Sequence, residues 1–134
     1  MNTIIALRGV ANRGKTASIK RVYDLLKGAY SKAMFQEIVV GVDIQIIITI
    51  DGVKVGIESQ GDPNSRLEES LEGFKKAKCD IIFCACRTRG MTVGWVNSLS
   101  PKYHIHFVAQ TYTNSSRAAS NAAMASSLMQ MAGL

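Results

Sequence analysis

Residues 9–16 read GVANRGKT, which fits the phosphate-binding pattern G-x-x-x-x-G-K-[ST] at every defined position. The two glycines allow the backbone to wrap around a phosphate group with its N–H groups pointing inward. The ammonium group of Lys15 can then reach the outer phosphates, and the hydroxyl of Thr16 can bind Mg²⁺. We predict that the nucleotide is bound by Gly9, Asn12, Arg13, Gly14, Lys15, Thr16 and Ala17, with Lys15 also acting in catalysis.

The segments on either side of this loop supply the context that its chemistry needs. Residues 3–7 are apolar and predict a strand that runs directly into the loop. After the loop, Ile19, Val22 and Leu26 follow helical spacing, and Gly28 is expected to end the helix. On this motif and its context the chain resembles the P-loop NTPases. The resemblance implies that it binds a nucleoside triphosphate with Mg²⁺.

The resemblance also implies a second, acidic residue near the metal ion, and three acids compete for that role. Glu58 ends a predicted strand, and residues 58–61 (ESQG) are similar to the D-x-x-G loop of GTPases; Asp62 follows at once. Asp51 also follows an apolar run, but Asp-Gly is the preferred two-residue hairpin turn and explains that position without a metal. We favour Glu58 and Asp62 as catalytic residues and Mg²⁺ ligands. The alternative is that Asp62 and Ser65 only cap the following helix.

Two further arginines can act on phosphate. Arg87 and Arg89 follow the buried strand predicted at residues 80–86, at the sheet edge where α/β folds bind ligands. Their guanidinium groups can clamp a transferred phosphoryl group, although an ordinary surface role explains them equally well. His104 and His106 alternate on a predicted strand, and we interpret them as packing residues rather than catalytic ones.

The rest of the chain predicts an α/β protein. Residues 44–57 predict a hairpin in which Ile50 pairs with Val53 across an Asp-Gly turn. Residues 29–41 are expected to form a loop, whereas Ser65 and Glu68 form a capping box for a second helix. Further helices are expected around residues 92–99 and from 115 onward, with a strand at 104–109 between them.

This order of elements predicts one domain, residues 1–134, with a mostly parallel sheet covered by helices on both faces. The hairpin adds one antiparallel strand at the edge of the sheet. The arrangement resembles the small GTPases and kinase-type P-loop proteins, and it implies a three-layer α/β/α P-loop NTPase fold. The GTPase base motif N/T-K-x-D is missing after residues 104–109. ATP is therefore favoured over GTP as the nucleotide.

Composition narrows the remaining possibilities. The 134 residues carry a formal net charge of +6, and no apolar run approaches the ~20 residues of a membrane span. We expect no membrane association and a cytoplasmic location. A nucleic acid is a possible partner by charge, but no basic run with interleaved aromatics supports it. The three cysteines do not have the spacing of a zinc or redox motif, which favours a role in core packing.

The sequence thus predicts a nucleoside-triphosphate-binding protein that binds Mg-ATP and hydrolyses it slowly. One alternative is a kinase for a nucleotide or small molecule, which would use Arg87 and Arg89 on phosphate. A second is a non-catalytic module that binds nucleotide or nucleic acid. The C-terminal helix, rich in alanine, serine and methionine, is a possible contact surface for a homo-oligomer.

Overall fold

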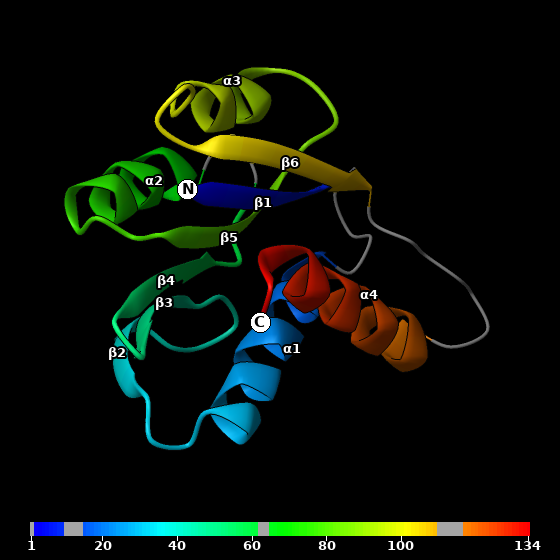
Figure 1. The fold of residues 1–134 in the computed structure, drawn as a ribbon. Helices are drawn as coiled ribbons and strands as arrows, with labels where there is room; N and C mark the ends of the chain where they lie inside the picture. The colour runs from blue at the N-terminus through cyan, green and yellow to red at the C-terminus, as the bar shows by residue number, and fades with distance from the viewer. Residues whose placement is uncertain (1, 10–14, 62–64, 110–116) are drawn as a thin grey trace.

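The computed structural model describes residues 2–9, 15–61, 65–109 and 117–134, except the side chains of 117–122 (Figure 1). Asn12, Arg13, Gly14 and Asp62, which the sequence places in the nucleotide site, lie outside the described residues. Four helices and six strands follow one another as β1 (Thr3–Arg8), α1 (Lys15–Ala29), β2 (Met34–Val39), β3 (Gln45–Ile50), β4 (Val53–Glu58), α2 (Leu67–Lys76), β5 (Ile81–Cys86), α3 (Met91–Asn97), β6 (His104–Ala109) and α4 (Arg117–Ala132).

The six strands form one mixed sheet in the order β2-β3-β4-β5-β1-β6. Strands β4, β5, β1 and β6 are parallel neighbours, while β3 is antiparallel to both β2 and β4. The α/β class is therefore confirmed. The expectation that the hairpin supplies the edge strand is wrong, because β2 occupies the edge beyond β3.

Strand β2 replaces the loop that the sequence predicts at residues 29–41. Its core-facing residue is Phe35, whose ring lies 6.2 Å from that of Tyr23 on α1 in an edge-to-face contact. Met34 and Ile38 are largely exposed, and the pairing with β3 shifts between Glu37 and Val39. An edge strand that buries few side chains and contains a bulge carries no clean period-2 pattern, so the sequence signal was weak.

The hairpin of β3 and β4 is confirmed in its register as well as its turn. Ile50 pairs with Val53, and Ile46 pairs with Ile57, as the alternating pattern requires. Asp51 and Gly52 both have positive φ, +48° and +84°, which is the conformation of a type I′ turn. The hairpin therefore extends the sheet and buries the alternating apolar side chains of one face in the core.

Helices cover both faces of the sheet (Figure 1). Helices α1 and α4 pack together on the face that contains Ile5 and Leu7, and α2 and α3 lie on the face that contains Ile4 and Ala6. None of the helices in the described ranges is long and apolar enough to cross a membrane. Helix α2 begins at Leu67 with Arg66 as its N-cap residue, so Ser65, which the sequence predicts at the capping position, lies one residue before it. The Ser65 hydroxyl accepts the N–H of Leu67 over 3.2 Å.

The three cysteines contribute to the core formed with α2 and α3. Cys84 and Cys86 lie on the same face of β5, and Cys79 precedes that strand. Burial raises the pKa of the Cys79 and Cys86 thiols from 9.0 to about 11, and it also raises the pKa of the Cys84 thiol well above its usual value. All three are free thiols, which agrees with the packing role that the sequence favours.

Candidate functional site

The segment that follows β1 lies where the strand order reverses. From β1 the chain builds the sheet on one side as far as β5, and it then crosses to β6 on the other side of β1. Parallel α/β sheets bind ligands at this point, beyond the carboxyl ends of the strands. The N–H of Gly9 donates to the carbonyl of Cys86 over 3.1 Å, so the ends of β1 and β5 are joined there.

Lys15 begins α1 and turns back to this same edge. Its Nζ donates to the carbonyl oxygens of Gly9, at 2.6 Å, and Cys86, at 2.9 Å. The side chain is 7% exposed. The ammonium group therefore lies between the carboxyl ends of β1 and β5, and Lys15 is the first residue of α1.

Thr16 faces an acidic residue that our reading of the sequence did not select. Its Oγ1 lies 3.4 Å from Oδ1 of Asp43, in the segment between β2 and β3, and 3.5 Å from the carbonyl oxygen of Ser59. Asp43 stands between Val42 and Ile44, so it lies between the predicted loop at residues 29–41 and the predicted hairpin at residues 44–57. A carboxylate placed immediately before the alternating apolar run was the available signal.

Two neighbours hold the Asp43 carboxylate in place. The Ser59 hydroxyl donates to Oδ1 over 2.8 Å, and Nε2 of Gln60 donates to Oδ2 over 3.3 Å. Oε1 of Gln60 accepts the N–H of Arg66 at 3.0 Å, which orients the amide so that its NH₂ group points at Asp43. The loop after β4 thereby positions the carboxylate beside Thr16.

Glu58 is placed differently from the metal ligand that the sequence predicts. Its side chain is fully buried and pairs with Arg66, whose Nε and Nη2 lie 2.7 Å and 3.0 Å from the two carboxylate oxygens. The Ser70 hydroxyl and the N–H of Gln60 donate to the same oxygens, at 2.5 Å and 3.1 Å. Four donors occupy the acceptor sites of the carboxylate, so this geometry ties the end of β4 to α2.

Gly61 completes this loop by its closeness to β5. A Cβ at this position would meet the backbone carbonyl carbon of Ala85 at 2.6 Å, which no real side chain tolerates. The glycine therefore allows residues 58–61 to lie directly on β5, one residue before the Cys86 carbonyl that holds Lys15. Glycine is required here by this close approach, and it brings residues 58–61 to the sheet edge where Lys15 lies.

The loop after β5 also begins at this edge. The backbone N–H of Arg87 donates to the buried Thr92 hydroxyl over 3.0 Å, while the Arg89 side chain is exposed. Arg87 directly follows the carbonyl that Lys15 contacts. This hydrogen bond joins the first residue of the arginine-containing loop to Thr92 in α3.

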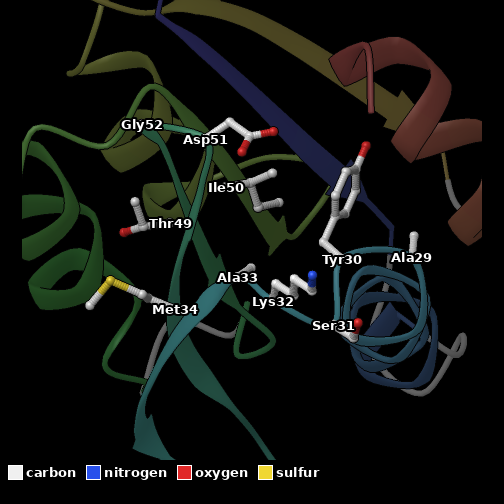
Figure 2. A pocket seen from close by; sticks show the side chains of 10 residues that line it. All are labelled: Ala29, Tyr30, Ser31, Lys32, Ala33, Met34, Thr49, Ile50, Asp51 and Gly52. Atoms are coloured by element: carbon white, nitrogen blue, oxygen red, sulfur yellow. The ribbon is translucent and has the colours of Figure 1, made fainter.

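Asp51 lies at the other edge of the sheet, because it precedes the amino end of β4 whereas Glu58 ends that strand. Figure 2 shows it at the β3–β4 turn, across a cavity of about 490 Å³ from Tyr30. The cavity is bounded by the end of α1 and the start of β2. Of the competing acids, Asp51 is therefore remote from Lys15 and Thr16.

The distance between the Thr16 and Asp43 oxygens is close to that between two ligands of one magnesium ion. Two ligands in adjacent positions of an octahedral Mg²⁺ site, each about 2.1 Å from the ion, stand about 3 Å apart. The 3.4 Å between Thr16 Oγ1 and Asp43 Oδ1 needs only a small adjustment to reach this value. Within the described ranges, no group of three or more His, Cys, Asp or Glu side chains is placed to hold a metal ion.

Comparisons with protein-family models, with curated proteins and with solved structures found no match to this chain. The case for a function therefore depends on the residues and geometry of the site.

Proposed function

We propose that this chain is a nucleoside-triphosphate-binding protein with a three-layer P-loop NTPase fold, which binds Mg-ATP and hydrolyses it slowly. The observation that carries the proposal is the position of Lys15. Its ammonium group lies between the carboxyl ends of β1 and β5, at the switch point of the sheet and at the end of the GVANRGKT motif. The helices on both faces of the sheet support the same fold.

Each residue of the predicted nucleotide site has a defined role in this proposal. Lys15 exchanges its carbonyl contacts for the outer phosphates, and the backbone after Gly9 surrounds them together with Asn12, Arg13 and Gly14. The first turn of α1, including Ala17, adds N–H groups and the positive end of the helix dipole. Mg²⁺, when bound, neutralises phosphate charge, and the Thr16 hydroxyl and the Asp43 carboxylate would hold it.

We propose Asp43, in place of Glu58, as the acidic ligand of Mg²⁺. Four hydrogen bonds already engage the Glu58 carboxylate, so we propose that it maintains the loop rather than binding metal. Both ends of the Gln60 amide are engaged as well, which suits it to hold Asp43. Asp62 remains a second candidate ligand because it directly follows Gly61.

A small kinase is the second candidate. The observation in its favour is that Arg87 follows the residue whose carbonyl contacts Lys15, so its loop begins beside the proposed phosphate site. A kinase would use Arg87 or Arg89 to bind the phosphate of an acceptor or of the transferred group.

Phosphate release from ATP tests the proposal. We expect slow, Mg²⁺-dependent release by the wild-type chain with no acceptor present, and loss of the activity in Lys15→Ala. Arg21→Ala, which removes one exposed positive charge from the same helix, is the matched control and should retain it. Release that appears only when nucleoside or nucleotide acceptors are added would favour the kinase. Equal release by wild type and Lys15→Ala would contradict the proposal.

A further inference from the structure

Both histidines of the chain lie on β6, away from the proposed nucleotide site. His104 and His106 are two residues apart, so their side chains point to the same face of the sheet. It is the face that Val108 shares with α1 and α4, whereas Ile105 and Phe107 face the opposite core. Strand β6 is an edge strand, which leaves His104 exposed and His106 half-buried.

The two imidazole rings lean toward one another. Side chains at i and i+2 leave a strand roughly 6.5–7 Å apart, yet the ring centroids of His104 and His106 are 4.7 Å apart, with the planes tilted by 46°. A metal ion about 2 Å from one nitrogen of each ring would place the centroids roughly 4.5–5.2 Å apart, for ligand angles of about 90–110°. The observed separation falls in that range.

Nothing in the described part of the chain competes for these rings. Neither imidazole takes part in a hydrogen bond or an ion pair there, and their contact is with each other. Their partners across the β1 pairing are Thr3 and Ile5, which bring no charge. A bound ion would thus take one nitrogen ligand from each imidazole.

We propose that His104 and His106 form a bidentate site for a borderline divalent transition ion of the Zn²⁺, Ni²⁺ and Cu²⁺ class. Imidazole nitrogen suits these ions and not Mg²⁺, which takes oxygen ligands. The site is independent of the Thr16–Asp43 pair, because it lies on β6 and uses nitrogen rather than oxygen ligands. Metal binding at β6 and nucleotide binding can therefore be tested separately, and the failure of one does not contradict the other.

Isothermal titration of the EDTA-treated chain with Ni²⁺ tests the site. The chain has two histidines, so the two single variants and the double variant cover all of its imidazole ligands. We expect one saturable site per chain, with affinity reduced about 100-fold in His104→Ala and equally in His106→Ala, because a chelate fails when either arm is lost. The double variant should lose little more than either single one. Lys102→Ala, which removes an exposed charge beside the strand, is the control and should bind as wild type.

Two results would overturn the proposal. Binding that survives the double variant would place the ion elsewhere. If each single variant instead binds half as many ions as wild type, and the double variant binds none, each histidine holds an ion separately and there is no bidentate site. Circular dichroism of each variant establishes that it is folded, and proton resonances of the two imidazoles, followed during the titration, report the site directly.

Discussion

At the scale of single residues, the site separates two carboxylates by what surrounds them. Glu58 has no exposed surface and is saturated by Arg66, Ser70 and the backbone of the loop. Asp43 is half-buried and lies beside the hydroxyl of Thr16. Separating a buried ion pair destabilises the fold because it leaves an uncompensated charge. Glu58 is therefore expected to remain paired with Arg66. In the proposed function, Asp43 is therefore the carboxylate that would hold the ion.

A charge-matched pair of substitutions tests this assignment. We expect Asp43→Asn to weaken Mg-ATP binding about 10- to 100-fold, because the amide removes the negative charge from the proposed metal site while keeping its shape. Binding of ATP in EDTA should change little or improve, since a negative charge near the phosphates is lost. Titrations with and without Mg²⁺ measure both effects.

Asp51→Asn is the control for that experiment. It removes the same charge at the remote β3–β4 turn, and asparagine also tolerates the positive φ of that position. If both variants lose Mg-ATP affinity equally, net charge rather than a metal ligand is responsible, and the role of Asp43 is refuted.

At the scale of elements, the loop from Glu58 to Gly61 connects β4, β5 and α2 to the site. Glu58 pairs with Arg66 before α2, Gln60 reaches Asp43, and Gly61 lies against the backbone of Ala85. The position of Asp43 therefore depends on how closely this loop can approach β5.

We expect Gly61→Ala to lower the free energy of unfolding by about 1–3 kcal/mol, since the new methyl group meets backbone atoms that cannot turn away. It should also weaken Mg-ATP binding, because Ser59 and Gln60 move with the loop. Gly28→Ala in α1 meets nothing within 4 Å and should stabilise by about 0.5–1 kcal/mol. Urea denaturation measures both; a Gly61→Ala variant as stable as wild type would contradict the close approach.

The sequence predicted elements where local patterns were strong. The hairpin followed from strict alternation around Asp51-Gly52, and its register was confirmed pair by pair. Strand β2 was missed because an exposed, bulged edge strand has no such pattern. Asp43 was missed for a related reason, since its meeting with Thr16 depends on pairings far apart in the chain. The motif predicts the role of Lys15, which stays a prediction, whereas the four hydrogen bonds to Glu58 depend on the fold and could not be predicted from the sequence.

At the scale of the whole molecule, the sheet has one core on each face, and ionisable groups lie within both. Tyr23 packs on one face and Tyr103 on the other, where Cys79, Cys84 and Cys86 also lie. Burial raises the pKa of Tyr103 to about 12 and those of Cys79 and Cys86 to about 11. The folded chain therefore keeps protons at alkaline pH that the unfolded chain releases.

This difference predicts alkaline sensitivity. The folded-state pKa of each thiol lies above the unfolded value of 9.0, so stability is complete below about pH 9 and falls as the pH rises toward 11. Urea midpoints measured under reducing conditions from pH 7 to pH 10.5 should decline above pH 9. The slope should be smaller in Cys86→Ala, and an unchanged midpoint up to pH 10.5 would contradict the burial of the thiols.

Calorimetric titration of the intact chain with Mg-ATP tests the proposed nucleotide site. We expect one saturable site that is lost in Lys15→Ala and retained in Arg21→Ala, with ATP bound more tightly than GTP. If neither nucleotide binds, or if the Lys15→Ala chain binds as well as wild type, the segment from Gly9 to Thr16 is not a nucleotide site.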